Sequence, residues 1–326
     1  MGPLVLIASM LLFLNHQQST NGYELSCGPQ FLTISPQQRC TLRNATQYEL
    51  DSFGVAGIPD GALLEILNPE INTFDEGAFL VVQKAHNLTF SRGIVKNIVF
   101  QSSTLVSLKV FNSWLVRFKV VEEDNFSLKT LSIKSDKYRI ISPTIRYLKG
   151  LEELTFQKCS LEFIDFEPFT ELEKLRLLDL SWNKIHSVRI DPSVPLAALK
   201  SLDMSYNKLS EMHNFPQAFP ALKVVSLKRN SWYCDWVSEA RGNIWTSGVT
   251  VMGAESYCGE PDEDLTNNGG LCCRERPKHL DEAHSVLQDV LDAIQVPSRN
   301  NKLQQLVVSV QSEDSTNPTV LIYNLI

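Results

Sequence analysis

The chain repeats a short apolar pattern about every 23 or 24 residues, and this period constrains its fold more than any other feature. The clearest copy places apolar side chains at Leu175, Leu178 and Leu180, followed three positions later by Asn183. The same offsets return downstream and, with substitutions, through most of the chain upstream. About eight such frames begin at Gly61, Ala85, Leu105, Leu128, Leu151, Leu175, Leu199 and Leu222.

Units of this length cannot bury an apolar face alone, but units stacked in register share one continuous core. Recurrence at these fixed offsets is the leucine-rich-repeat pattern, in which each unit is a short strand plus a return segment. The sequence therefore predicts an α/β fold. We expect a leucine-rich-repeat solenoid with a curved parallel sheet on its concave face, disulfide-stapled caps and a short helical C-terminal tail.

Strand alternation predicts which side chains face outward from this sheet. The first, fourth and sixth frame positions point into the core, so the third, fifth and seventh point onto the concave face. Apolar anchors within a polar surround favour protein recognition, and Phe111, Leu177 and Val224 fit that role. The concave-face binding candidates are Phe111, Lys134, Glu153, Gln157, Leu177, Asp179, Asp203, Val224 and Lys228.

The return segments carry apolar residues with a period of their own. They stand where the chain must fold back onto the core, so we expect them to fill its wide outer layer. This set comprises Phe74, Phe79, Ile164, Phe169, Phe215 and Phe219.

The first 22 residues contain no Asp, Glu, Lys or Arg, and an apolar run from Leu4 to Leu14 precedes polar residues that end at Gly22. This is typical of a secretory signal peptide, although the usual N-terminal positive charge is missing. The run is too short to span a membrane, and no other stretch is long enough. We expect cleavage near Gly22 and a secreted, soluble chain. The alternative is a cytosolic protein with an apolar first strand.

Secretion would place the seven cysteines in an oxidising environment. Cys159 stands where other repeats have Asn, and we expect it to be a buried free thiol. The other six flank the repeats. Cys27 and Cys40 would staple the first cap, and a bridge between the adjacent Cys272 and Cys273 would be strained. Two pairings of the last four then remain, either Cys234 with Cys272 and Cys258 with Cys273, or the same partners exchanged.

Three N-glycosylation sequons, at Asn44, Asn87 and Asn125, agree with secretion. Sugar on Asn87 would sit on the concave face and shift the binding area towards repeats four to eight. The net charge of −7 argues against nucleic acid and anionic membranes as main partners.

The pattern divides the chain into five parts. We expect a signal peptide over 1–22, an N-terminal cap over 23–60, repeats over 61–230, a cysteine-containing cap over 231–275 and a short helical or irregular tail over 276–326. In the tail, Leu280, Leu287 and Ile294 are seven residues apart, which indicates a helix of barely two heptads. A coiled coil needs three or four, so docking on the cap or fraying is preferred over a dimerising helix.

The leader, the N-terminal cysteine pair, the irregular repeats and the double cysteine Cys272-Cys273 resemble the mosquito leucine-rich-repeat immune proteins, whose hallmark is a double-cysteine cap. Better-known members continue into a long coiled coil, form disulfide-linked heterodimers and hold a thioester-containing, complement-like protein in haemolymph. This chain lacks a long heptad region and has no cysteine after Cys273. It therefore looks like a short or coil-less member.

This resemblance implies a secreted binding protein of innate immunity, located in haemolymph, that recognises a protein partner or a pathogen surface through its concave face. The implied partners are a thioester-containing complement-like protein or another leucine-rich-repeat immune protein. One alternative is an extracellular adhesion or developmental protein, or a soluble decoy of a leucine-rich-repeat receptor. Another, an enzyme or hydrolase inhibitor, has no positive motif.

The sequence contains no Gly-x-Ser-x-Gly, no His-Glu-x-x-His and no glycine-rich phosphate loop. We therefore predict no enzymatic activity, no cofactor and no metal site. Asp179 and Asp203 align on neighbouring strands about 4.8 Å apart and could approach a cation. Their local sequence is common in such repeats, so solvated side chains are the preferred interpretation. The acidic loop from Glu260 to Asp264 does not match a calcium-binding loop.

Overall fold

The computed structural model describes residues 18–20, 23–29, 38–52, 57–255, 258, 265–277, 307–311 and 319–323. They belong to two compact units, Met1–Arg274 and Glu275–Ile326. Among these residues, no helix is both long enough and apolar enough to span a membrane.

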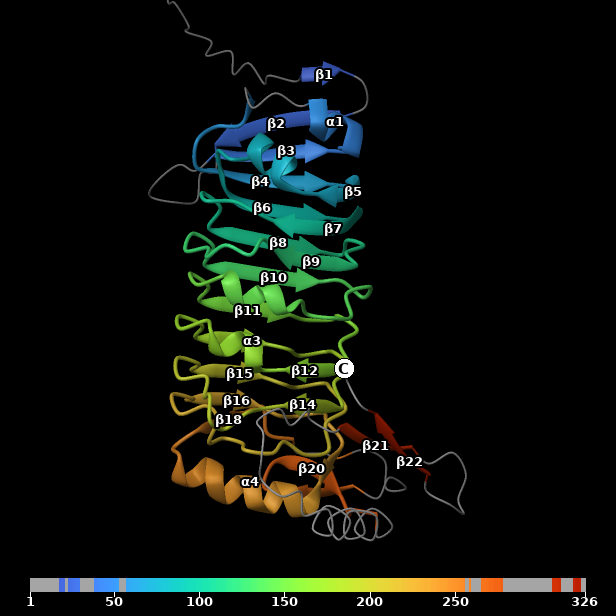
Figure 1. Ribbon diagram of the computed structural model, residues 1–326, viewed down its shortest axis with the longest axis vertical. Coiled ribbons are helices and arrows are strands. Elements are labelled where there is room, and N and C mark those ends of the chain that lie inside the picture. Colours follow the sequence, from blue (N-terminus) through green and yellow to red (C-terminus); the bar gives the residue numbers. More distant parts are fainter. Residues whose placement is uncertain are drawn as a thin grey trace, which may run out of the picture. The chain divides into compact units, whose positions relative to one another are not determined.

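The first unit is built on one long sheet whose strands follow one another in chain order (Figure 1). An antiparallel start is followed by parallel pairing from β3 to β18. The strands are β1 (Gln18–Thr20), β2 (Tyr23–Pro29), β3 (Gln38–Arg43), β4 (Ala62–Leu67), β6 (Ala85–Ser91), β8 (Ser107–Phe111), β10 (Thr130–Lys134), β11 (Glu153–Phe156), β13 (Leu177–Asp179), β15 (Ser201–Asp203), β16 (Val224–Ser226) and β18 (Thr250–Met252).

Strand register confirms the repeat frame. The fourth frame position of each repeat pairs with the fourth position of the next, and every one of these side chains is buried. Inward leucines stacked in this way form the common core that single repeats cannot build. The ladder consists of Leu64, Leu88, Leu108, Leu131, Leu154, Leu178, Leu202 and Val225.

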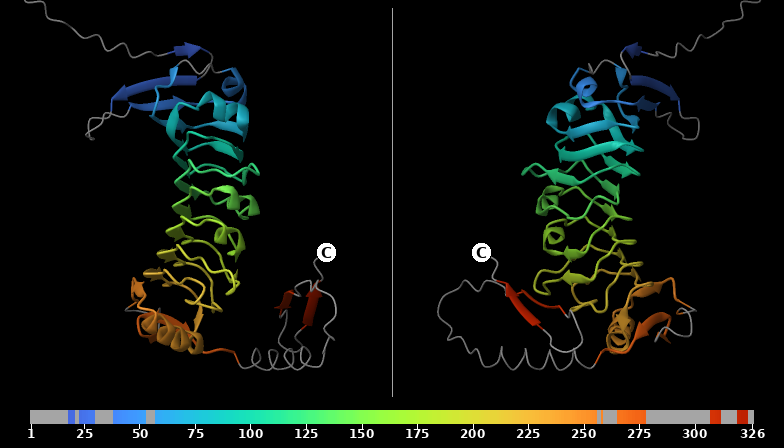
Figure 2. Two further views of the ribbon diagram at one scale, coloured as in Figure 1. Left: turned by 60° about the vertical axis from the view of Figure 1, so that its left-hand side comes forward. Right: turned by 90° about the vertical axis from the view of Figure 1, so that its right-hand side faces the viewer.

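The return segments form the second layer. In Figure 2 the helical turns lie on the side away from the long sheet. The predicted apolar residues of this layer are all buried, and Phe74 packs edge-on against Phe79 at a centroid distance of 4.8 Å. The elements here are α1 (Gln47–Ser52), β5 (Glu70–Phe74), α2 (Glu76–Val81), β7 (Ile94–Phe100), β9 (Arg117–Val120), η2 (Pro143–Tyr147), β12 (Phe163–Asp165), α3 (Glu167–Thr170) and β14 (Ser187–Arg189).

The ninth frame position supplies polar groups that tie successive repeats together. The Asn207 amide nitrogen donates to the carbonyl oxygens of Leu180 and Met204, at 2.9 and 3.0 Å, and its Oδ1 accepts from Ile185 N at 3.0 Å. Cys159 stands in the same place, as predicted. It is a free thiol, 6% exposed, whose Sγ donates to Ile133 O at 3.5 Å.

Both ends of the first unit carry disulfides. Cys27–Cys40 links β2 to β3. At the other end the pairing is Cys234–Cys273 and Cys258–Cys272, the second of the two alternatives left open by the sequence.

The C-terminal cap extends the long sheet beyond the last repeat, because β18 pairs with β16. Trp232 is fully buried beneath the cap and stacks on Trp236 at 4.2 Å. The cap comprises β17 (Trp232–Tyr233), α4 (Cys234–Thr246), β18, β19 (Thr266–Asn268) and β20 (Leu271–Arg274).

In the second unit, β21 (Val307–Gln311) and β22 (Thr319–Tyr323) form an antiparallel hairpin. This part of the tail was expected to be helical or irregular, but its β-branched residues favour strands. The helix expected over Leu280 to Ile294 lies outside the described residues. So do the acidic loop from Glu260 to Asp264 and, apart from β1, the expected leader.

Candidate functional site

The outward face of the long sheet between β8 and β16 is the candidate binding face, and it carries the nine predicted residues. Parallel register places Glu153, Leu177, Ser201 and Val224 side by side in one row across β11, β13, β15 and β16. Leu177 and Val224 are half-buried, and Glu153 is exposed. The row therefore presents two apolar side chains separated by a serine and bordered by a carboxylate.

The next row contains Asp179 and Asp203, which are register partners. Each carboxylate is engaged within its own turn. Asp179 Oδ1 accepts from Ser181 N at 2.9 Å, and Asp203 Oδ1 accepts from Ser205 N at 2.8 Å. These bonds are local turn-stabilising contacts. No cluster of three or more His, Cys, Asp or Glu that could hold a metal occurs among the described residues.

Polar cross-strand contacts fix several other candidates on this face. Gln157 Nε2 donates to Ser181 Oγ at 3.0 Å and to Asp179 Oδ2 at 3.4 Å. The Lys134 ammonium lies 5.5 Å from the centroid of the Phe111 ring, within cation–π range. Side chains held in this way lose less conformational entropy when a partner binds.

Sequence reasoning missed a second feature, at the C-terminal ends of the strands, which we call the exit edge. Trp182 and Tyr206 stack there with ring centroids 3.8 Å apart and planes inclined by 8°. Lys158 covers the Trp182 ring at 5.6 Å, and Lys228 covers the Tyr206 ring at 5.7 Å. The four side chains form an aromatic pair with a cation at each end.

Backbone conformation aligns this group. Lys158, Trp182 and Tyr206 have φ of 53°, 59° and 55°, the left-handed conformation that few residues other than glycine adopt. They occupy the eighth frame position, 24 residues apart. That spacing was visible in the sequence, but strand alternation ends at the seventh position and does not say where the eighth side chain points.

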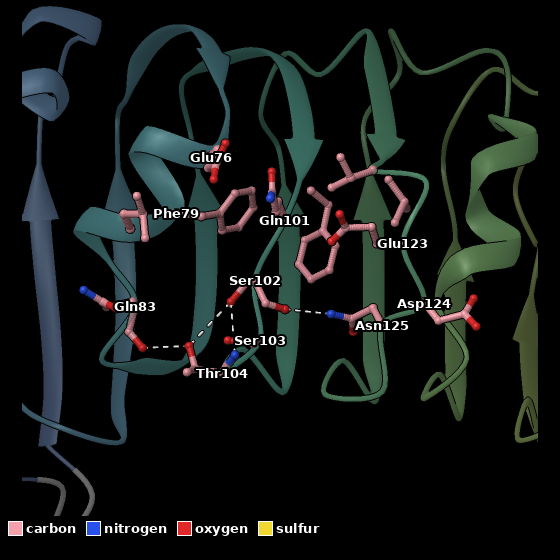
Figure 3. A pocket seen from close by; sticks show the side chains of 14 residues that line it. Glu76, Phe79, Gln83, Gln101, Ser102, Ser103, Thr104, Glu123, Asp124 and Asn125 are labelled. Carbon is pink, nitrogen blue, oxygen red and sulfur yellow. Dashed lines mark hydrogen bonds between the residues drawn. The ribbon is translucent and has the colours of Figure 1, made fainter.

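A pocket of about 310 Å³ lies on the return side, and Glu76, Glu123 and Asp124 are among the residues that line it. Figure 3 shows Asn125, one of the sequon asparagines, among the residues that line it. Asn125 Nδ2 donates to Ser102 O at 2.6 Å, and its Oδ1 accepts from Leu128 N at 2.9 Å. These bonds fix the loop conformation around Asn125. Of the other two sequons, Asn44 is exposed, and Asn87 is half-buried on β6 in register with Ser107.

Residues 149–209 match the family model described as leucine rich repeat. This match covers the stretch in which the frame and the asparagine contacts are most regular. The fold is a leucine-rich-repeat solenoid. Nothing in a search of curated proteins matches the chain.

Solved structures of mosquito leucine-rich-repeat proteins are among the similar folds. The LRIM1 leucine-rich repeat domain is 18% identical, with a TM-score of 0.49, and the match covers 82% of this chain and 98% of that one. The APL1B domain is 19% identical, with a TM-score of 0.46 and coverages of 66% and 72%. The match to the LRIM1/APL1C complex is 20% identical, with a TM-score of 0.43. It covers 72% of this chain and 55% of that one, so this chain spans about half of that protein's length.

Proposed function

We propose that this chain is a secreted binding protein of innate immunity that recognises a protein partner through the candidate binding face between β8 and β16. The observation that carries this proposal is the row of Leu177, Ser201 and Val224, in which half-buried apolar side chains are set among fixed polar ones. Protein interfaces commonly combine such apolar anchors with a polar rim.

The extracellular part of the proposal is supported by the apolar leader in the sequence and by three disulfides, since such bonds persist mainly in oxidising compartments. The immune part is supported by the double cysteine Cys272-Cys273, because a double-cysteine cap is the hallmark of the mosquito immune proteins that the chain resembles. As partners we propose a thioester-containing complement-like protein, another leucine-rich-repeat immune protein or a pathogen surface component.

Capture from haemolymph with a matched pair of double variants tests the binding face. Leu177→Arg with Val224→Arg changes two apolar residues of the face. Ile140→Arg with Phe163→Arg changes two exposed apolar residues outside it by the same chemistry. Quantitative mass spectrometry should show the captured partner reduced at least about tenfold by the first pair and unchanged by the second. Equal losses in both, or none in the first, would refute the assignment of the face.

Transcript measurement after infection tests the immune part separately. Induction is expected for an immune protein, whereas an adhesion or developmental protein should follow tissue or stage instead. A developmental profile without induction would contradict the immune assignment and leave the binding face untouched.

A further inference from the structure

A hollow of about 780 Å³ lies beside the exit edge, where the chain leaves β6, β8, β10 and β11. Four cationic residues line it, Arg92, Lys134, Lys137 and Lys158, together with the single carboxylate of Asp136. Positive charge is therefore concentrated at one place on a chain whose net charge is −7. A concavity lined by one sign of charge attracts ligands of the opposite sign.

Most of this positive charge is not neutralised within the part of the chain that the structure describes. Lys137 Nζ lies 3.0 Å from Asp136 Oδ2, which forms one ion pair. Arg92, Lys134 and Lys158 form no ion pair with any described residue. An anionic ligand would supply the carboxylates that these three cations lack.

Aromatic rings hold the three lysines of the hollow in place. Lys137 Nζ is 5.1 Å from the centroid of Trp114, and Lys134 and Lys158 lie over Phe111 and Trp182. A cation–π contact positions an ammonium group without occupying all of its N–H donors. The lysines can therefore bind an anion at a reduced entropic cost.

Apolar surface lies within the same hollow. The side chains of Trp114 and Ile94 are 49% and 42% exposed, and the two residues are bridged on adjacent segments. A ligand that fills the hollow must therefore contact both cations and an apolar surface. A peptide that combines Asp or Glu with an aliphatic or aromatic residue meets both needs, whereas a sulfated polysaccharide offers no apolar side chain.

We propose that this hollow binds an acidic peptide segment of a partner protein, with carboxylates at Arg92, Lys134 and Lys158 and an apolar side chain against Trp114 and Ile94. The inference rests on the proposed function, because it names the chemistry of a partner that the binding face would also contact. Lys134 and Gln157 belong to both surfaces, so one partner can cover the two together.

The direct test is titration of the full-length secreted protein with a fluorescein-labelled peptide in which glutamate and leucine alternate. Lys134→Gln with Lys158→Gln should raise Kd about tenfold, equivalent to about 1.4 kcal/mol. The matched control is Lys200→Gln with Lys223→Gln, two exposed lysines just before β15 and β16. It changes the net charge equally and should alter Kd less than about twofold. Circular dichroism checks that each variant is folded.

Further ligands define the chemistry of the site. Replacing glutamate by glutamine in the peptide should abolish measurable binding, and replacing leucine by serine should weaken it. The Trp114→Ser variant should lose the preference for leucine over serine. Equal weakening of peptide binding by both pairs of lysine variants would overturn the proposal, because binding would then depend on net charge and not on the hollow. Binding of heparin that depends on Lys134 and Lys158, with no peptide binding, would overturn it in favour of a polysaccharide site.

Failures of the two proposals are distinguishable. If the peptide binds as expected but partner capture is insensitive to Leu177→Arg with Val224→Arg, the proposal for the binding face is refuted and the proposal for the hollow stands. Partner capture sensitive to that pair, without peptide binding, refutes only the hollow.

Discussion

The two halves of the repeat region share one frame but differ in the length of their strands and in the structure of their return segments. From β4 to β10 the strands of the long sheet have five to seven residues, and the return side contains the parallel sheet β5-β7-β9. From β11 to β16 the strands have three or four residues, and the return side has the helical turn α3 and the short pair β12-β14.

The ninth frame position accounts for much of this difference. In the second half Asn183, Asn207 and Asn230 stand there, and each Oδ1 accepts the N–H of a residue at the start of the preceding repeat's return segment. In the first half the same position holds Pro69 and Gly93, and backbone carbonyl oxygens replace the side chains. Ile94 N donates to Pro69 O at 2.6 Å, and Trp114 N donates to Gly93 O at 2.8 Å. Backbone pairing at this point continues directly into the return sheet.

The largest effect should come from breaking the backbone stacking of the first half at Gly93. A Cβ there would lie 2.4 Å from Pro69 O and 2.5 Å from Pro69 N. Because both atoms are backbone, Gly93→Ala should lower the free energy of unfolding by about 4 kcal/mol in urea denaturation. Gly242→Ala in α4, where no atom lies within 4 Å of the added Cβ, should be neutral or stabilising. Wild-type stability of Gly93→Ala would contradict the close stacking.

The side-chain contacts of the second half are tested at Asn207. Asn207→Ala leaves the carbonyl oxygens of Leu180 and Met204 and the Ile185 N–H without this partner, and should cost about 3 kcal/mol. Ser113 is at the same frame position in the first half, and among the described residues its hydroxyl donates to Phe111 O alone, so Ser113→Ala should cost about 1 kcal/mol. Comparable losses at the two positions, measured by thermal and urea unfolding, would remove the distinction between the halves.

Cys159 lies at the junction of the halves, and its thiol should make the free energy of unfolding depend on pH. Burial raises the pKa of this thiol to about 12 from 9.0; the Asp136 charge also raises it, and a hydrogen bond with the Ser135 backbone opposes the shift. The unfolded chain therefore loses this proton at lower pH than the folded one. Its stabilising contribution is complete below about pH 9 and falls by about 1.4 kcal/mol per pH unit up to about pH 12.

The Cys159→Ser variant should lack this contribution. The stability difference between wild type and the variant should therefore shrink as the pH rises from 9 towards 12. A difference that stays constant over this range would show that Cys159 is accessible to solvent.

The smallest expected effect concerns Tyr138, which is fully buried and stacks on Phe156 at 5.4 Å. Burial raises the pKa of its hydroxyl, an effect that the nearby backbone of Ser142 opposes, and the oxygen makes no hydrogen bond of normal distance and angle to any described residue. Tyr138→Phe should raise the free energy of unfolding by about 1 kcal/mol. A destabilised variant would show that the hydroxyl is hydrogen-bonded after all. The buried polar group of this repeat would then be satisfied as fully as those at the asparagine positions.

Sequence period was sufficient for the features that depend on strand alternation alone. It predicted the buried ladder from Leu64 to Val225 and the outward positions of Leu177 and Val224. It did not predict the sheet β5-β7-β9, because that sheet depends on a backbone contact between Pro69 and Gly93 rather than on an apolar period.

Two other features required knowledge of local conformation. The stack of Trp182 on Tyr206 depends on the left-handed turn that follows each strand. Cys272 and Cys273 form disulfides with different partners because they are neighbours on β20, and adjacent residues of a strand point to opposite faces. One therefore reaches Cys258 and the other Cys234.

Lysine footprinting of the native complex tests the central claim most directly. The protein, alone and with its haemolymph partner bound, is acylated briefly, and each lysine is quantified by mass spectrometry. Binding through the candidate binding face predicts protection of Lys109, Lys134 and Lys228, whereas Lys96, Lys184 and Lys208, which lie outside it, should be labelled as before. Protection of Lys96, Lys184 and Lys208, with the first three unchanged, would contradict the claim that the outward face of the long sheet is the binding surface.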